Sequence, residues 1–423
     1  MASRSEGRSG LAARSEGDHA EDTPEQAAFR AEARAFVRSH LPPRRDANPW
    51  ALNFTPDESE ARAHFESGRA WQRLLFDNGF AGLTYPREYG GRGGVAWHER
   101  IFREELADVE APTSFISATI AMLGPTLMRH GTDEQRDEYL PRLLSGDDAW
   151  CQLFSEPGAG SDLAGLACRA DRDGDHFLVN GQKVWNSAAN FCDRGMLLVR
   201  TDPEVPKHHG ITFLLVDMDS PGVEVRPLVQ ATGSAHFNEV FLADVSVPVS
   251  RVLGQINEGW APARTVMSNE SAFIGGGGGG GNTNEKLVML ARAFGAVSDP
   301  TIRQELARHY TRERLLAIMG EAIQAAVRQR KAPPIDPSIL KLFVAENRVL
   351  SGNLAMAMAG AAALVTTDDR SAWMQAELVG RYGVSIGGGT NEVQRNNLAE
   401  RALGLPREPS VDRDVAWREI RRS

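Results

Sequence analysis

The sequence predicts an α+β protein in which a run of short strands stands between two helical segments. Apolar residues recur at helical spacing as far as about residue 145, where the pattern changes to short runs of β-branched and aromatic residues. Helical patterns return beyond Gly259 and continue toward the C-terminus. This order differs from the strand–helix alternation of a parallel α/β fold, so a dinucleotide-binding fold of that kind is disfavoured.

The first helical segment begins at residues 23–26, Thr-Pro-Glu-Gln. Thr as N-cap, Pro at the first helical position and Gln three residues after Thr form a capping box. A second helix is expected over 57–78, with Gly79 as its left-handed C-cap, and helical pattern resumes over 97–144. The buried face of the first helix is predicted to consist of Phe29, Ala33, Phe36 and Val37.

The middle segment is predicted to form a small antiparallel barrel or sandwich. The turn-forming residues at 173–175 and at 180–181 are expected to close hairpins. Seven runs have strand character: Trp150–Phe154, His176–Val179, Lys183–Asn186, Met196–Thr201, Ile211–Met218, Val223–Leu228 and Glu239–Leu242.

Composition excludes several classes of protein. The 423-residue chain carries 56 Asp and Glu against 47 Lys and Arg, an acidic balance that argues against nucleic-acid binding. No run approaches the roughly 20 apolar residues that a membrane span needs. The three cysteines, Cys151, Cys168 and Cys192, form no CxxC pair, so neither a disulfide framework nor a metal site is predicted. Without an apolar signal core at the N-terminus, we expect a cytoplasmic protein.

The pattern divides the chain into four parts. Residues 1–22 are rich in Ser, Arg, Glu and Gly and are expected to be a disordered tail. We then expect an N-terminal helical domain over 23–147, a middle β-barrel domain over 148–250 and a C-terminal helical bundle domain over 251–423.

Two motifs in the middle segment are candidates for a ligand site. Residues 151–162 run from a strand into a Gly- and Pro-rich turn whose backbone N–H groups could approach an anion or a ring edge. Trp185 and Ser187, in the run 181–187, would share one face of a strand. Taken singly, the first motif also fits a corner turn of a barrel, and Trp185 also fits a core residue.

Together the two motifs resemble those of the acyl-CoA dehydrogenase family. Four further motifs follow in that family's order, at residues 85–91, 131–141, 387–396 and 399–406. The resemblance therefore covers almost the whole chain. It implies an N-terminal α-helical domain, a middle antiparallel β-barrel and a C-terminal four-helix bundle. It also implies FAD between barrel and bundle, and assembly into a homo- or hetero-oligomer.

The resemblance assigns roles to individual residues. Gln152, Phe154 and Ser155 would contact the flavin ring, Gly160 would meet the cofactor, and Ser161 would reach flavin or substrate. The remaining implied cofactor contacts are Trp185, Ser187, Thr390 and Glu392. A flat apolar ring suits an aromatic wall with a few donors.

The general base implied by the resemblance is Glu270. Many family members place this Glu directly before Gly-Thr in the C-terminal motif, where this chain has Gly388. A minority, including isovaleryl- and long-chain-type enzymes, place it on the first long helix after the barrel, which corresponds to Glu270. The Arg that usually follows is Ser271 here. Glu156 lies in a turn motif and is expected to be structural.

Three segments depart from the family pattern. A Gln- and Gly-rich loop that usually approaches the FAD of the neighbouring subunit corresponds to Ala357–Ala363, which keeps one Gly and no Gln. The family also contacts the cofactor through an Arg-x-x-Phe motif. The matching residues here are Arg292-Ala-Phe294, in which the Arg stands one residue too close to the Phe. The run Gly275–Gly281 fits either a flexible segment or side-chain-free space for a large acyl group, with the first slightly favoured.

The sequence therefore predicts an FAD-dependent acyl-CoA dehydrogenase. It would take an α-proton from an acyl-CoA or acyl-carrier thioester, pass a β-hydride to flavin N5, and deliver electrons to an electron-transfer flavoprotein. Two other functions fit the same residues: a non-catalytic or half-site partner subunit of a heteromeric dehydrogenase, and a flavin oxidase or monooxygenase on the same fold.

Overall fold

The computed structural model describes residues 22–44, 48–52, 57–112, 115–275, 283–328, 331 and 336–420. All but one residue of the tail predicted over 1–22 lies outside these ranges. Contacts divide the chain into two compact units, one comprising Met1–Ala47 with Gly94–Ala111 and the other comprising Asn48–Gly93 with Pro112–Ser423. The two units are described separately.

The first unit contains α1 (Pro24–His40) and α3 (Ala96–Leu106). Helix α1 begins with the predicted capping box, in which the Gln26 N–H donates to Thr23 Oγ1 over 3.3 Å and the Thr23 N–H donates to Gln26 Oε1 over 3.0 Å. Arg30 of α1 pairs with Glu105 of α3 over 3.2 Å. The predicted apolar face is confirmed, because α1 buries Phe29, Ala33, Phe36 and Val37.

The second unit opens with three helices in the regions predicted to be helical: α2 (Glu58–Asp77), α4 (Phe115–His130) and α5 (Asp133–Ser145). Asp57 caps the N-terminus of α2, and Gly79 adopts a left-handed conformation with φ +72° just after the helix. Thr132 and Gln135 form a second capping box at the start of α5. Helix α2 packs against both α4 and α5.

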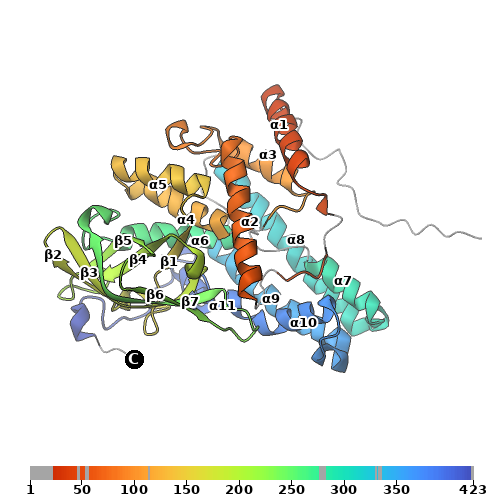
Figure 1. Cartoon of the computed structure of the whole chain (residues 1–423). Coiled ribbons are helices and arrows are strands. Elements are labelled where there is room, and N and C mark those ends of the chain that lie inside the picture. The colour runs from red at the N-terminus through yellow and green to blue at the C-terminus, as the bar shows by residue number, and fades with distance from the viewer. Residues whose placement is uncertain are drawn as a thin grey trace, which may run out of the picture. The chain divides into compact units, whose positions relative to one another are not determined.

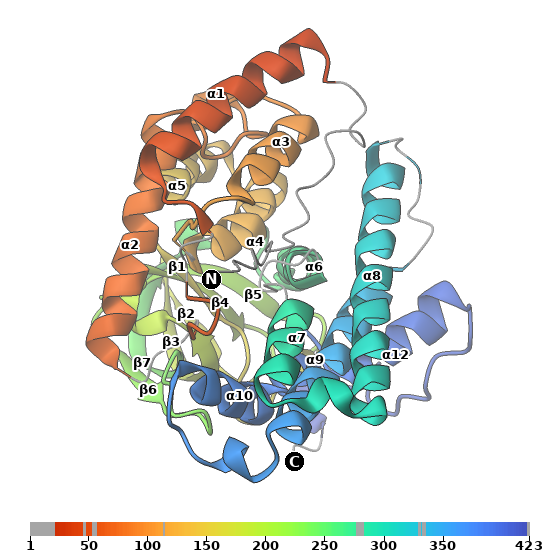
Figure 2. The same ribbon diagram turned by 90° about the vertical axis from the view of Figure 1, so that its right-hand side faces the viewer.

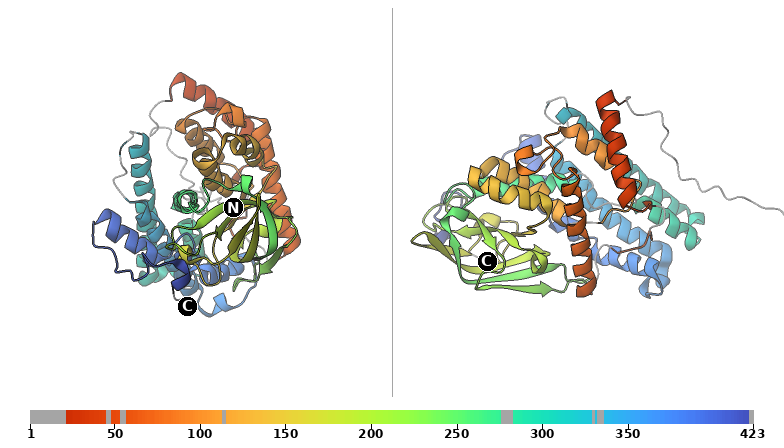
Figure 3. Two further views of the ribbon diagram at one scale, coloured as in Figure 1. Left: turned by 90° about the vertical axis from the view of Figure 1, so that its left-hand side faces the viewer. Right: turned by 45° about the horizontal axis from the view of Figure 1, so that its top comes forward.

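A curled sheet follows, shown from two sides in Figure 3. In the described residues it has seven strands in the order β1-β4-β2-β3-β7-β6, with β5 paired to β4 (Figure 1). The strands are β1 (Trp150–Leu153), β2 (Arg169–Asp173), β3 (His176–Ser187), β4 (Arg194–Arg200), β5 (Ile211–Asp217), β6 (Val223–Leu228) and β7 (Phe237–Pro248).

The sheet differs from the prediction in three respects. It is mixed, because β1 and β2 both run parallel to β4. Strand β2 was not predicted, since its sequence Arg-Ala-Asp-Arg-Asp buries only Ala170 and carries little strand signal. The expected turn at Asn180–Gly181 is wrong: β3 continues through it with a register shift, and a Cβ on Gly181 would lie 2.7 Å from Cys168. The hairpin turn at 173–175 is confirmed.

Seven α-helices follow the sheet in the described residues: α6 (Trp260–Gly275), α7 (Thr283–Ala293), α8 (Pro300–Arg328), α9 (Pro337–Ala359), α10 (Asp369–Gly380), α11 (Gly383–Ile386) and α12 (Asn391–Asn397). Helix α9 is central, because it contacts α6, α7, α8, α10 and α12 (Figure 2). Helix α6 ends at the first glycine of the run Gly275–Gly281, and the rest of that run lies outside the described residues.

Within the described ranges, no helix is long and apolar enough to cross a membrane, and no cluster of His, Cys, Asp or Glu could hold a metal ion. All three cysteines are buried and free. Burial raises the pKa of the Cys168 thiol to about 11, which keeps it protonated and unreactive at neutral pH.

Candidate functional site

Trp185 is a large aromatic residue exposed on a distorted strand. Its side chain is 59% exposed, and its backbone has φ +64°, a left-handed conformation that is uncommon for a bulky residue. It lies where the pairing of β3 with β7 shifts register between Lys183 and Asn186. The Asn238 side chain of β7 donates to the Asn186 carbonyl over 2.9 Å and so holds the bulge. Such strain, fixed by its surroundings, is typical of a ligand site.

The segment after β1 is held beside this bulge. The Val184 N–H donates to the Ser155 carbonyl over 2.9 Å, and Lys183 Nζ donates to the Phe154 carbonyl over 3.1 Å. The Asn186 side chain donates to the Gln152 carbonyl over 2.7 Å. These bonds bring the predicted residues Gln152 and Ser155 next to the strand that carries Trp185.

A buried ion pair fixes the loop that carries Ser155, Gly160 and Ser161. The Glu156 carboxylate accepts hydrogen bonds from the Ala167 N–H over 2.6 Å and the Cys168 N–H over 2.9 Å. Lys183, whose side chain is fully buried, donates to the same carboxylate over 2.8 Å. The carboxylate thus closes the loop onto β3, and these contacts agree with the structural role expected of Glu156.

Other predicted cofactor residues lie on the same loop or strand. Phe154 is 3% exposed, and its ring packs edge-on against Phe213 in the core. Gly160 and Ser161 are exposed, and a Cβ on Gly160 would meet no atom within 4 Å. Ser187 ends β3 opposite Phe237 of β7.

Glu270 lies on α6 and is half-buried. Helix α6 is tied to α4, because the side chains of His130 and Thr265 hydrogen-bond over 2.9 Å and the Asn269 side chain donates to the Met122 carbonyl over 3.4 Å. Burial raises the pKa of Glu270, and a hydrogen bond from the Gln152 side chain opposes that rise. The side chain of Gln152 on β1, a predicted flavin contact, therefore acts on the pKa of the predicted base.

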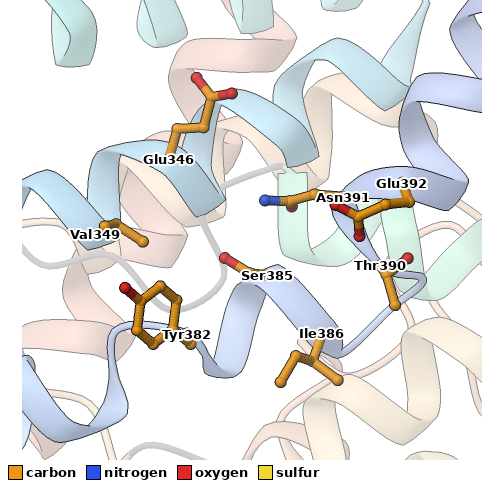
Figure 4. A pocket seen from close by; sticks show the side chains of 8 residues that line it. All are labelled: Glu346, Val349, Tyr382, Ser385, Ile386, Thr390, Asn391 and Glu392. Atoms are coloured by element: carbon orange, nitrogen blue, oxygen red, sulfur yellow. The ribbon is translucent and has the colours of Figure 1, made fainter.

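The remaining predicted residues line a groove of about 480 Å³ between α9, α11 and α12 (Figure 4). Thr390 caps α12 by accepting the Val393 N–H over 3.2 Å, and Glu392 lies in the first turn of that helix. The volume is in the range of small-molecule sites. The groove is lined by Glu346, Val349, Tyr382, Ser385, Ile386, Thr390, Asn391 and Glu392.

Lys341 of α9 was missed by the sequence analysis, because a single Lys in a helical run carries no signal of burial. Its side chain is fully buried, and its ammonium donates to the Gly389 carbonyl. Its charge acts on the carboxylates of Glu270 and Glu392. Lys341 thus lies on the helix that packs against both α6, which carries the predicted base, and α12.

These features fit a bound flavin. Trp185 offers an exposed aromatic surface, and the adjoining loop leaves open space at Gly158 and Gly160, where a Cβ would meet nothing within 4 Å. In the groove, the buried side-chain oxygen of Asn391 has no hydrogen-bond partner among the described residues, which leaves an acceptor for a ligand.

Comparison with known proteins identifies the class of protein. Three family profiles match consecutive parts of the chain: acyl-CoA dehydrogenase, N-terminal domain, at residues 23–147; middle domain at 151–245; and C-terminal domain at 257–403. The chain belongs to the acyl-CoA dehydrogenase family, whose members are flavin-dependent oxidoreductases. The predicted family is confirmed.

Individual relatives cover nearly the whole chain. Acyl-CoA dehydrogenase IpdE1 from Mycobacterium tuberculosis is 38% identical over 387 residues, which are 90% of this chain and 98% of that protein. The solved structure named Tcur3481-Tcur3483 steroid ACAD is 31% identical with a TM-score of 0.74, covering 92% of this chain and 99% of its own. The solved structure of the ChsE4-ChsE5 complex from Mycobacterium tuberculosis is 30% identical with a TM-score of 0.68. The match covers 92% of this chain and 100% of that chain.

Replacing Trp185 by Ala is expected to weaken flavin binding roughly tenfold, because it removes a large aromatic contact surface. The measurement is the dissociation constant for FAD, by fluorescence titration of the flavin-stripped protein. Trp185→Phe is the matched control, because it keeps an aromatic ring at the bulge and is expected to bind FAD more tightly than the Ala variant. Equal affinity of the Ala variant and the wild type would show that Trp185 does not contact the cofactor.

Proposed function

We propose that this chain is an FAD-dependent acyl-CoA dehydrogenase that introduces an α,β double bond into an acyl thioester, with Glu270 as the general base. The observation that carries the proposal is the position of Glu270 on α6, where the side chain is half-buried, burial raises its pKa, and the Gln152 side chain of β1 opposes that rise. Gln152 is in turn bonded to the strand that bears the exposed Trp185.

In this arrangement Glu270 accepts the proton released from the α-carbon of the substrate. Its raised pKa makes the carboxylate a stronger base than an exposed glutamate. Loss of a proton from the α-carbon and of a hydride from the β-carbon leaves an α,β-unsaturated thioester.

Flavin, when bound, supplies the acceptor for that hydride. We assign Gln152, Ser155 and Trp185 to the flavin ring, but not Phe154, because that residue is buried and its ring packs against Phe213 in the core. To the rest of the cofactor we assign Gly160, Ser187, Thr390 and Glu392. Ser161 is assigned to contact with the substrate. An electron-transfer flavoprotein is proposed as the subsequent electron acceptor.

For the substrate we propose a bulky acyl-CoA such as a steroid-derived thioester. The support is a relative named a steroid ACAD, which is 31% identical over nearly the whole chain. The test is a panel of linear, branched and steroid-derived acyl-CoA thioesters, assayed with an artificial electron acceptor on the flavin-loaded protein. Faster turnover of linear than of steroid-derived thioesters would contradict this substrate class. Turnover with O₂ alone, with stoichiometric peroxide, would instead indicate an oxidase.

A second candidate function is that of a half-site subunit in a heteromeric dehydrogenase. Two of the similar structures are named as pairs of proteins, Tcur3481-Tcur3483 and ChsE4-ChsE5. In this chain the segment Ala357–Ala363 lacks the Gln and two of the glycines expected for a loop that approaches a neighbouring FAD. Flavin binding and turnover that appear only after mixing with a co-purified second chain would favour this function.

A further inference from the structure

A segment beyond α12 returns to the sheet and packs onto the turn between β4 and β5. The Trp417 N–H donates to the Val205 carbonyl over 2.9 Å, and Ala416 forms an isolated β-bridge with Pro206. Residues 410–419, called the strap below, therefore belong to the helical C-terminal part by sequence but are fixed to the middle segment by their contacts.

Trp417 anchors the strap. It is 8% exposed, and its indole N–H donates to the Gly165 carbonyl over 3.2 Å. The guanidinium of Arg200 lies over the indole ring, 4.9 Å from its centroid, a distance at which a cation is attracted to an aromatic face. Arg200 is itself buried and donates to the Ala164 carbonyl over 2.6 Å. The two stacked side chains thus hold the 3₁₀ turn Leu163–Gly165 through its carbonyls.

Lys207 joins the strap to the same loop by charge. Its ammonium donates to Asp162 over 2.9 Å and to Asp412 of the strap over 2.7 Å. The Ser410 hydroxyl donates to the other carboxylate oxygen of Asp412 over 2.6 Å. The side chains of Lys207 and Asp412 are only 12% and 27% exposed, so solvent screens this pair less than a surface pair. Asp162, the loop partner, directly follows Ser161.

The loop held in this way carries the residue assigned to the substrate. Its first part is closed onto β3 by the ion pair between Glu156 and Lys183. Its last part, 162–165, is held by Arg200, Lys207 and the strap. Gly160 and Ser161 lie between these two attachments and are exposed. The position of the Ser161 hydroxyl therefore depends on both attachments.

We propose that Trp417 and Asp412 are positioning residues through which the strap holds Ser161 ready for the acyl-CoA thioester. The inference rests on the proposed function, which assigns Ser161 to the substrate. A loop that is fixed at both ends before the substrate arrives loses less conformational entropy on binding. The strap also follows α12, whose Thr390 and Glu392 are assigned to the cofactor, so one stretch of chain joins the two sides of the proposed site.

The first test is amide hydrogen–deuterium exchange of the flavin-loaded, full-length protein, read by mass spectrometry. Exchange reports local opening of the loop whatever reaction the protein catalyses. The amides to follow are those of Gly165 and Leu166, which donate to the Asp162 and Leu163 carbonyls and close the turn. Loss of the buried hydrogen bond in Trp417→Ala is expected to speed their exchange roughly tenfold.

Three further variants make this test specific to the strap. Asp412→Asn removes one charge of a partly exposed pair and is expected to speed the same exchange about threefold. Arg418→Ala is the matched control, because it breaks an exposed ion pair with Glu204 in the same strap and leaves both loop contacts in place. If Trp417→Ala does not fold, Trp417→Phe keeps an aromatic ring, lacks the N–H donor and takes its place. Exchange in the Trp417 variant no faster than in Arg418→Ala would overturn the proposal.

The second test asks whether the strap acts through Ser161. Binding of a steroid-derived α,β-unsaturated acyl-CoA, the proposed product class, is measured by calorimetry on the oxidised, flavin-loaded protein. Trp417→Ala is expected to weaken binding about threefold, because the loop must then be ordered on binding. In a Ser161→Ala background the same change should have almost no effect, since coupled residues are not additive.

A merely structural role would give the same loss of affinity in both backgrounds, and that result would overturn the proposal. The proposed function fails in a different way. A wild-type protein that binds no acyl-CoA would refute the proposed function and with it the role of Ser161. Faster exchange in Trp417→Ala with unchanged thioester affinity would refute the role of the strap in binding while leaving the proposed function in place.

Discussion

Replacing Glu270 by Gln is expected to slow flavin reduction by acyl-CoA by about a thousandfold or more, since a positioned general base contributes roughly 10² to 10⁴ in rate. Gln has nearly the same shape as Glu but accepts no proton at neutral pH. The variant should still bind flavin and substrate, because Gln152, Ser155 and Trp185 are untouched. The measurement is the rate of anaerobic flavin bleaching after mixing with a saturating acyl-CoA.

The pH profile provides a second readout of the same variant. A base works only when deprotonated, so the wild-type rate should fall as pH falls through the pKa of Glu270. Burial raises that pKa, so the fall should begin at a higher pH than for an exposed glutamate. Glu258→Gln is the matched control, because Glu258 lies just before α6, outside the proposed site, and its variant should retain the wild-type profile. Equal bleaching rates in Glu270→Gln and Glu258→Gln would remove Glu270 from the mechanism.

Replacing Lys183 by Met is the second change with a large expected effect. It leaves the Glu156 carboxylate buried without its cation, and breaking a buried pair in this way costs about 3–5 kcal/mol of unfolding free energy. The loop from Ser155 to Cys168 also loses one of its ties to β3, the bond from Lys183 to Glu156, so flavin affinity should fall together with stability. The measurements are chemical denaturation of the flavin-free protein and FAD titration.

Two controls separate the charge from the packing. The double variant Glu156→Gln with Lys183→Met removes both charges and should be more stable than Lys183→Met alone, because no unpaired charge remains buried. Arg73→Ala breaks a half-exposed pair with Asp77 on α2 and should leave stability and flavin affinity close to wild type. A Lys183→Met variant as stable as the wild type would show that the pair does not hold the loop.

Much of the fold could be predicted from local signals in the sequence. The capping box at Thr23 and the spacing of Phe29, Phe36 and Val37 predicted α1 and its buried face, because helix ends and faces depend on residues a few positions apart. The change of period near residue 149 predicted where strands replace helices, and the family resemblance predicted the α+β architecture. The domain boundaries and the roles of the site residues stay predictions.

The features that the sequence missed depend on distant partners. Asn180–Gly181 has the composition of a tight turn, yet β3 passes through it because β7 pairs with both sides and Cys168 lies against Gly181. Strand β2 forms from a charged run because it pairs with β3 and extends the sheet toward β4. Lys341 has the sequence context of a surface lysine, and only the packing of α6, α9 and α12 reveals it as a buried cation.

The most direct test of the account is a single-turnover experiment on the purified, flavin-loaded chain without any partner. The protein is mixed anaerobically with steroid-derived or linear acyl-CoA, and the loss of flavin absorbance is compared with the amount of α,β-unsaturated thioester found by mass spectrometry. The account predicts one unsaturated product per reduced flavin, with no product from Glu270→Gln on the same timescale. Flavin that stays oxidised with every thioester, or product from Glu270→Gln at the wild-type rate, would contradict it.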